Sequence, residues 1–163
     1  MTVMQTFQVQ PVSAADRAWR SALLEKEWGA TWVVSRGRLH RADELPGFIG
    51  VRGAEHIGLV TYRIEAGECE IVSLNSLVES IGVGSQLIAA VKDVAVAARC
   101  KRLWLITTND NTHALRFYQR RGFTIAAVHV NAIAESRKLK PMISLFGIDG
   151  IPIRDEIELE IIL

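Results

Sequence analysis

Two glycines separated by one residue stand where the chain changes from one apolar pattern to another. The segment Glu79–Gly84 reads Glu-Ser-Ile-Gly-Val-Gly and joins an apolar run over residues 71–78 to a helical pattern over residues 85–99. Glycines let the backbone turn tightly, and they leave N–H groups exposed where a helix begins. Such N–H groups bind phosphate oxygens, so this segment is a candidate phosphate-binding loop. A Gly-x-Gly sequence by itself also fits an ordinary turn.

A second group of residues with chemical potential follows about 30 positions later. Asn111 and Tyr118 are seven residues apart in a short helical pattern that ends before Gly122. Seven residues make two helical turns, so the amide and the phenol are expected on one helix face. An amide can hydrogen-bond a ligand and a phenol can donate a proton. The pattern therefore predicts a second wall of the same site.

Taken in this order, the two segments resemble the GNAT superfamily of acetyl-coenzyme A-dependent N-acetyltransferases. The pyrophosphate loop of that family reads Gln/Arg-x-x-Gly-x-Gly/Ala, and a later motif reads Asn-x-x-Ala-x-x-x-Tyr-x-x-x-Gly-Phe. The later motif is matched at every position, by Asn111, Ala114, Tyr118, Gly122 and Phe123. The resemblance is clear over roughly residues 45–130, and it implies an acetyl transfer to a primary amine.

One position departs from the family pattern. Glu79 stands where the family has Gln or Arg, which places a carboxylate beside the expected pyrophosphate. Backbone N–H groups can still hold the anion because they do not depend on the side chain. The departure puts a side-chain contact to the phosphates in doubt, and repulsion between like charges is expected to weaken coenzyme binding.

The resemblance implies acetyl-coenzyme A as co-substrate and no metal. The strand before the loop is expected to separate from the next parallel strand and to offer its backbone to pantetheine. Asn111 is expected to bond the pantetheine amides, although Asp110, Asn111 and Thr112 also favour a helix start. The expected coenzyme-binding residues are Val72, Ser73, Leu74, Glu79, Ser80, Ile81, Gly82, Val83, Gly84, Ser85, Asn111, Ala114 and Phe117. For Arg116 and Arg120, a solvated helix face is favoured over a phosphate contact.

Three residues are candidates for proton transfer. The resemblance assigns Tyr118 as the acid that protonates the leaving thiolate, and a buried packing tyrosine is the alternative. Glu68 and Glu70 precede the loop, and either is a candidate for the base that neutralises the amine; solvent-facing hairpin carboxylates are the alternative. If the strand is regular the two share a face, and a bulge would change this. His40 and His56 lack a partner at metal-ligand spacing, so no metal site is predicted, and for His129 a structural role is favoured over a catalytic one.

Near the end of the chain, Glu156, Glu158 and Glu160 alternate with apolar residues. This pattern predicts a strand with one wet face. In the family that strand often borders the acceptor site, so the acidic face is either a site for a cationic amine or a solvated surface. Residues 32–40 and 132–153 are expected to decide the acceptor.

Composition narrows the class of protein. With 163 residues and a 49% hydrophobic fraction, the chain is expected to form a single domain, 1–163. A net charge of +1 gives no support to nucleic-acid binding. No apolar run approaches the roughly 20 residues of a membrane span. Two cysteines without metal or disulfide spacing, and a segment Met1–Gln5 without a signal pattern, favour the cytoplasm.

The expected elements form an α+β domain, with a mixed and mostly antiparallel sheet between helices. Strands are predicted over residues 6–10, 48–52, 56–64, 68–77, 102–107, 123–130 and 155–163, and helices over 13–28, 85–99, 112–121 and 131–139. Residues 30–45 are predicted to be mostly loop. A strand, helix and strand after Glu68 require that part of the sheet is parallel.

The leading hypothesis is an N-acetyltransferase in which the amine attacks acetyl-coenzyme A directly within a ternary complex, since no Cys or Ser stands in a nucleophile motif. The alternative is a coenzyme A-binding regulatory or interaction domain without turnover, which Glu79 favours. The acceptor is expected to be a small-molecule or peptide amine. A homodimer through the apolar last strand is a further possibility.

Overall fold

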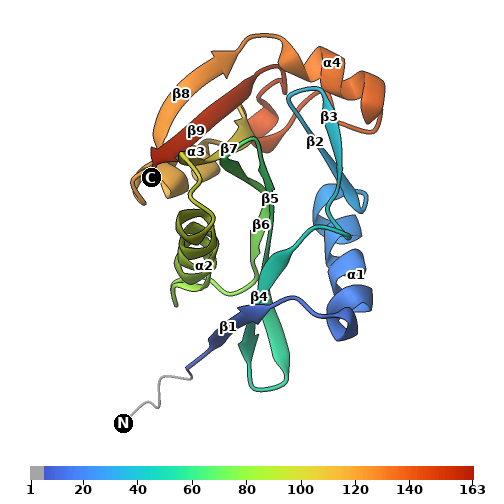
Figure 1. The fold of residues 1–163 in the computed structure, drawn as a ribbon. Helices are drawn as coiled ribbons and strands as arrows, with labels where there is room; N and C mark the ends of the chain where they lie inside the picture. The colour runs from blue at the N-terminus through green and yellow to red at the C-terminus, as the bar shows by residue number, and fades with distance from the viewer. Residues whose placement is uncertain (1–5) are drawn as a thin grey trace.

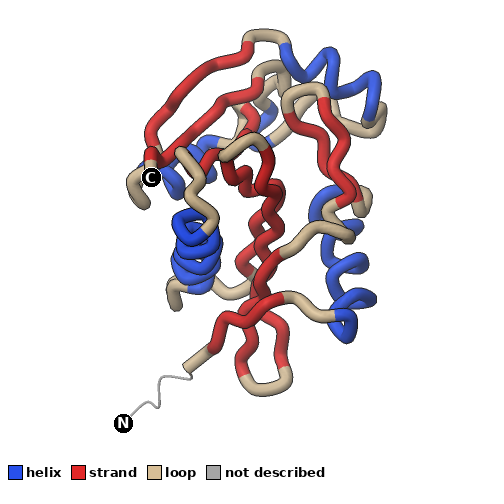
Figure 2. Tube along the Cα trace, in the orientation of Figure 1, coloured by secondary structure: helices blue, strands red, loops and turns tan. Residues whose placement is uncertain are grey.

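A computed structural model describes residues 6–163 and shows a central sheet with helices on both faces (Figure 1). The N-terminal pentapeptide Met1–Gln5, which lacks a signal pattern, lies outside the described residues. The sheet has seven strands in the order β1-β4-β5-β6-β7-β9-β8, and a separate hairpin, β2–β3, lies beside it. Figure 2 shows the central strands β4, β5 and β6 between α2 on one side and α1 on the other.

The first half of the chain supplies one helix, the hairpin and the antiparallel part of the sheet. Its elements are β1 (Gln8–Pro11), the 3-10 helix η1 (Ala14–Asp16), α1 (Arg17–Trp28), β2 (Trp32–Ser35), β3 (Arg38–Arg41), β4 (Gly47–Arg52), β5 (Glu55–Glu65) and β6 (Glu68–Ser76). The predicted start at Ser13 is found, because Ser13 and Asp16 form a reciprocal capping box. α1 ends at Gly29, whose φ of 75° is the left-handed conformation that ends many helices.

The second half begins with a crossover. Its elements are α2 (Val83–Ala97), β7 (Arg102–Thr108), α3 (Thr112–Gln119), β8 (Thr124–His129), α4 (Ala132–Leu139), the 3-10 helix η2 (Ile148–Gly150) and β9 (Glu156–Ile162). β6 and β7 pair in parallel through α2, and every other pair in the large sheet is antiparallel. The predicted mixed, mostly antiparallel sheet is therefore confirmed.

Two apolar cores hold the layers together. On one face, Leu87 and Val91 of α2 pack on sheet residues such as Ile71 and Leu103. On the other face, Leu24 of α1 packs on a second set of sheet residues that includes Leu59 and Val72. The residues named here are at most 7% exposed, so burial of apolar area on both faces is what stabilises the three-layer arrangement.

β6 has two irregularities that shape the site. Its register with β5 shifts between Thr61 and Tyr62, so Val72 is an extra residue in the ladder. As a result, Val72 and Leu74 pack in opposite cores, although residues two apart in a regular strand share a face. The pairing of β6 with β7 also stops at Ile71–Leu105, while both strands run on. The two parallel strands therefore separate beyond this point.

The structure corrects two expectations. Residues 30–45 are not mostly loop, because β2 and β3 pair from Trp32–Arg41 to Ser35–Arg38. The turn residues Arg36 and Gly37 have φ of 49° and 70°, the left-handed pair that matches the twist of a hairpin. The last strand is also not free to pair with a second copy of the chain, because β9 lies between β7 and β8.

Among residues 6–163, none of the helices combines the length and the apolar character that a membrane crossing requires.

Candidate active site

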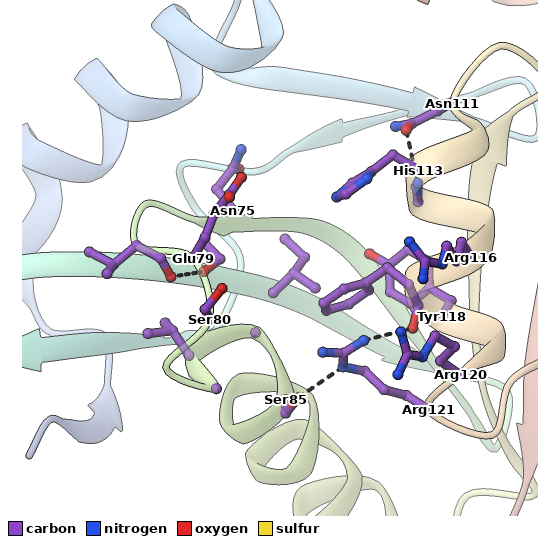
Figure 3. Close-up of a pocket in the computed structure, with 18 residues that line it drawn as sticks. Asn75, Glu79, Ser80, Ser85, Asn111, His113, Arg116, Tyr118, Arg120 and Arg121 are labelled. Atoms are coloured by element: carbon purple, nitrogen blue, oxygen red, sulfur yellow. Dashed lines mark hydrogen bonds between the residues drawn. The ribbon is translucent and has the colours of Figure 1, made fainter. Parts of the chain in front are cut away.

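A cavity of about 900 Å³ opens between the end of β6, the first turn of α2 and one face of α3 (Figure 3). The cavity is lined by the two segments that the sequence singled out, the glycine loop and the helix that begins after Asn111. Its lining consists of Leu74, Asn75, Ser76, Val78, Glu79, Ser80, Gly82, Val83, Gly84, Ser85, Asn111, His113, Ala114, Arg116, Phe117, Tyr118, Arg120 and Arg121.

The glycine loop forms one end of the cavity. Ser80 and Gly82 have φ of 64° and 86°, so the loop alternates through left-handed conformations before the helix begins. α2 starts at Val83, two residues earlier than expected, and its first bond runs from Gln86 N–H to the Gly82 carbonyl. The N–H groups of the residues between them have no place in the helical ladder. They are available for an anion at the positive end of the helix.

The two glycines have different structural roles. A Cβ atom on Gly82 would meet nothing within 4 Å, so the space beside it is open. A Cβ atom on Gly84 would stand 2.8 Å from Cζ of Phe117, so the second glycine lets an α3 ring approach α2. Only the first glycine faces open space where a ligand can approach.

Arg121 connects α3 to the start of α2 through hydrogen bonds. Its Nε donates to Oγ of Ser85 at 2.9 Å, and a second guanidinium nitrogen donates to the Phe117 carbonyl at 2.9 Å (Figure 3). The guanidinium also lies 3.5 Å from the centroid of the Phe117 ring, a cation–π geometry. Arg121 therefore fixes the width of the cavity between the two helices.

Arginines give the α3 wall a positive charge. Arg116 and Arg120 are exposed, as a solvated helix face requires, and they also line the cavity together with Arg121. Glu79 adds one negative charge at the opposite, loop side of the same cavity. The balance favours an anionic ligand along α3.

Asn111 caps α3. Its Oδ1 accepts a hydrogen bond from Ala114 N–H at 3.0 Å. The expected alternative, a helix cap, is therefore correct for this oxygen. The residue lines the cavity as well. Capping occupies the carbonyl of the side chain and leaves its NH₂ group for a ligand.

Tyr118 lies on the same face of α3, two turns further along. Its ring packs edge-on against Phe117 and Phe123, with centroid distances of 5.1 and 5.5 Å. Burial raises the pKa of the Tyr118 phenol, and the nearby Arg121 charge only partly opposes this. The phenol is therefore protonated at neutral pH and can act as a proton donor.

Not every predicted coenzyme-binding residue lines the cavity. Val72 is buried in the core beneath α1, and the Ser73 hydroxyl lies 2.6 Å from that of Thr61. Ile81 is 39% exposed and contributes nothing to the lining. A role for Val72 and Ser73 therefore rests on their backbone, at the place where β6 has left β7.

The two candidate bases on β6 have different environments. Glu68 is half-buried and bonds to Arg102 at 3.1 Å. Glu70 is 2% exposed and accepts a hydrogen bond of 2.6 Å from the Ser35 hydroxyl. Burial raises the pKa of Glu70, while Ser35 and Arg63 partly oppose the rise. A carboxylate whose pKa is raised is the better proton acceptor, so Glu70 is the stronger candidate.

The acidic face of β9 is not a solvated surface. Arg102 bonds to Glu158 at 2.7 Å and to Glu160 at 2.8 Å, which leaves little of their charge for another cation. Glu156 is 1% exposed, because the hairpin covers it. The prediction of one uniform wet face is thus wrong, since β9 is an interior strand and its neighbours supply partners.

Ser35, Arg36 and His40 lie in the segment 32–40 that was expected to decide the acceptor, but their contacts with Glu70 and Glu156 were not predicted. The run Trp32–Val34 before Arg36-Gly37 is typical of a strand that enters a hairpin, but the turn lacks the usual Asn or Asp. His40 lies 2.9 Å from Ser35 and is 4% exposed. Within the part of the chain that the structure describes, no three His, Cys, Asp or Glu side chains are grouped to hold a metal ion.

Comparison with known proteins agrees with this geometry. A sequence profile described as "Acetyltransferase (GNAT) family" matches residues 7–123. The uncharacterized protein YdhI of Bacillus subtilis is 46% identical over 133 residues, which is 81% of this chain and 83% of that protein.

Solved structures share the fold at low identity. A Bacillus subtilis acetyltransferase in complex with CoA is 18% identical with a TM-score of 0.70, over 97% of this chain and 99% of that one. A GNAT acetyltransferase from Elizabethkingia anophelis with acetyl-CoA bound is 20% identical with a TM-score of 0.68, over 96% and 98% of the two chains. The profile spans most of the sequence and includes both motif segments, and on that ground the chain belongs to the acetyltransferase (GNAT) family.

Proposed function

We propose that the whole chain, residues 1–163, acts as one domain that transfers the acetyl group of acetyl-coenzyme A to a primary amine. The observation that carries the proposal is that the cavity extends from the free N–H groups of α2 to Leu74, at the gap between β6 and β7. A pyrophosphate fits the first location and an extended pantetheine fits the second, because the unpaired strand backbone can bond its amides.

The charges of the cavity support the same ligand. The first turn of α2 and the α3 arginines suit the phosphates of the coenzyme. The Asn111 amide suits the pantetheine arm, and Phe117 and Ala114 supply apolar contact. The thioester, which supplies an activated acetyl group, would then lie near Tyr118 and the separated strands.

Two residues are suited to move protons. Glu70 accepts a proton from the acceptor ammonium, so that the amine nitrogen carries a free electron pair. That pair forms the new N–C bond at the thioester carbonyl while the C–S bond breaks and the sulfur leaves with its electrons. Tyr118 donates its phenolic proton to this thiolate and recovers a proton from solvent afterwards.

Direct attack is favoured over an acyl-enzyme route. Cys69 and Cys100 are buried, and neither lines the cavity. Burial raises the pKa of the Cys69 thiol to about 12, so it is not the thiolate that nucleophilic attack requires.

A second candidate function is coenzyme A binding without turnover. Glu79 favours it, because its carboxylate lines the cavity close to the expected phosphates. Isothermal titration with acetyl-coenzyme A, followed by thiol release against a panel of primary amines, separates the two. Binding with amine-dependent thiol release supports the transferase, binding without release supports the second function, and absence of binding contradicts both.

A further inference from the structure

Asn75 is a polar residue of β6 that lines the cavity. It pairs with Leu59 of β5 and directly follows Leu74, beyond the point where β6 and β7 separate. Asparagine is uncommon in strands, because its side chain competes for backbone hydrogen bonds and packs poorly on a sheet. A residue that contradicts the local preference beside a cavity is a candidate for a functional contact.

The carbonyl half of the Asn75 amide is bound to α1. Nε1 of Trp28 lies 2.9 Å from Oδ1 of Asn75, and an indole N–H can only donate. The bonded atom of Asn75 is therefore the oxygen, and the other end of the amide is the NH₂ group. Within residues 6–163 this Nδ2 has no hydrogen-bond partner, and it is not among the buried polar atoms. Asn75 thus has two free donors beside the cavity.

Trp28 is itself held in place from outside the cavity. It is the last residue of α1, and its carbonyl accepts a hydrogen bond of 2.7 Å from Nζ of Lys140. Lys140 also donates to the Trp32 carbonyl at 3.1 Å, so one ammonium group joins α1, the β2–β3 hairpin and the end of α4. The Trp28 side chain packs against the core that contains Leu24. The orientation of the Asn75 amide is therefore set before a ligand binds.

Asn111 has the same arrangement on the opposite wall. Its Oδ1 accepts from Ala114 N–H, which leaves the NH₂ group for a ligand. Figure 3 shows Asn75 on the strand side of the cavity and Asn111 at the start of α3. Both walls therefore present amide donors, while both amide carbonyls are bonded within the protein. Donors on two sides favour a ligand segment whose polar atoms are acceptor oxygens.

The position of Asn75 along the chain indicates which part of the coenzyme it meets. It lies after Ile71, where the pairing with β7 ends, and before the loop Glu79–Gly84. Under the proposed function the thioester lies near the first location and the pyrophosphate at the second. The part of acetyl-coenzyme A between these two groups is the pantetheine arm, whose amide carbonyls are acceptors.

We propose that the NH₂ group of Asn75 donates a hydrogen bond to an amide carbonyl of pantetheine, and that Trp28 is the positioning residue that keeps this amide in the donating orientation. The inference rests on the proposed function. A flipped Asn75 amide would turn its oxygen toward the ligand carbonyl and its NH₂ group toward the Trp28 N–H. Both contacts would then be lost, so only one orientation is stable.

Ligand titration of the intact protein tests the contact with Asn75→Asp. The carboxylate keeps the size of the side chain and an oxygen for the Trp28 N–H, but an acceptor replaces the NH₂ donor. Acetyl-coenzyme A should therefore bind about 10- to 100-fold more weakly. ADP carries a pyrophosphate and no pantetheine, so its affinity should change less than about threefold, and this smaller change measures the general effect of the added charge.

Asn131→Asp is the matched control, because it makes the same substitution at an exposed residue outside the cavity lining. Its affinities for both ligands should equal those of the parent. Equal losses for acetyl-coenzyme A and ADP in Asn75→Asp would mean repulsion by charge alone, and an unchanged affinity for acetyl-coenzyme A would mean no contact. Either result overturns the proposal. A parent protein that does not bind acetyl-coenzyme A refutes the proposed function as well, so the two failures are distinguishable.

The role of Trp28 is tested with Trp28→Phe, which keeps an aromatic ring and removes the indole N–H. Acetyl-coenzyme A should bind about 2- to 10-fold more weakly to this variant, with ADP unaffected. If Trp28 acts through Asn75, the same change should add no further loss to Asn75→Asp. An equal additional loss in that background would contradict the positioning role.

A measurement on the parent protein does not depend on any variant folding. In ¹⁵N-labelled protein, the side-chain NH₂ signals of Asn75 should shift saturably with acetyl-coenzyme A. They should stay in place with ADP at a concentration that saturates the shift of the Gly82 amide. Asn75 signals that move equally with both ligands, or with neither, contradict a contact with pantetheine.

Discussion

The Phe117 ring occupies the space that a side chain on Gly84 would need, since a Cβ atom there would stand 2.8 Å from Cζ. This contact sets the distance between α2 and α3, the two helices that line the cavity. Arg121, which stacks on the same ring and bonds to Ser85, connects this ring to the first turn of α2. The second glycine of the loop is therefore explained by helix packing as well as by any ligand.

Gly84→Ala should destabilise the protein by about 1–3 kcal/mol, because the added methyl group overpacks the contact with Phe117. Urea unfolding measures the effect. Phe117→Leu shortens the opposing side chain, so the double variant should recover part of the loss. If the two changes are simply additive, the ring is not the group that excludes the methyl.

Gly82→Ala separates backbone strain from ligand contact when it is compared with Gly53→Ala. Both glycines have positive φ, 86° and 62°, and a Cβ atom added to either would meet no other atom within 4 Å. Similar strain of about 1–2 kcal/mol is therefore expected in the two variants. Only Gly82 lines the cavity.

Titration calorimetry should therefore show acetyl-coenzyme A binding weakened about tenfold or more in Gly82→Ala, and unchanged in Gly53→Ala. Parallel losses in the two variants would mean that the effect is general destabilisation, and unaltered binding in both would remove the loop from the coenzyme site.

Glu79→Gln should tighten acetyl-coenzyme A binding roughly two- to fivefold, the usual range for an exposed charge contact. The reason is that Glu79 is the one carboxylate among the lining residues, whereas Arg116, Arg120 and Arg121 supply positive charge. The gain should fade as salt is added, because salt screens exposed charges. Weaker binding would show that Glu79 makes a favourable contact.

Tyr118→Phe should lower kcat by roughly 10²-fold with little change in coenzyme affinity, because only the phenolic hydroxyl is lost. The pKa of Tyr118 is raised by burial, so the parent enzyme should keep its acid form as the pH rises through the range where an ordinary tyrosine ionises. A variant that turns over within about twofold of the parent would leave Tyr118 with a packing role.

Glu70→Gln should remove the low-pH limb of kcat/KM, whereas Glu68→Gln should keep it. The pKa of Glu70 is raised by burial, so its basic form is lost as pH falls through a value above that of an ordinary glutamate. A raised pKa in the folded state also means that stability is lost as pH rises from the ordinary carboxyl pKa through that value.

Glu70→Gln should therefore flatten this part of the unfolding free energy curve as well. If instead the Glu68 variant loses the limb, the base is the carboxylate bonded to Arg102.

Features of the candidate site could be predicted from the sequence where they depend on residues only a few positions apart. Glu79–Gly84 between a strand pattern and a helix pattern, and Asn111 two turns before Tyr118, predict a loop and a helix face without knowledge of their contacts. The strands from residue 47 onward also follow from local pattern, because alternation and turn residues act within a few positions.

Tertiary structure alone decided which carboxylates are buried and which are paired with an arginine. Glu68 and Glu70 have similar sequence surroundings. In the fold, however, Arg102 forms an ion pair with Glu68, whereas Ser35 of the β2–β3 hairpin bonds to the buried Glu70. Glu156 likewise differs from Glu160, because the Arg36 backbone N–H bonds Glu156 from 120 residues away and Arg102 bonds Glu160. Burial and pairing of these groups depend on strand order and on the β2–β3 hairpin, which are contacts between distant segments, and periodicity within one segment carries no information about them.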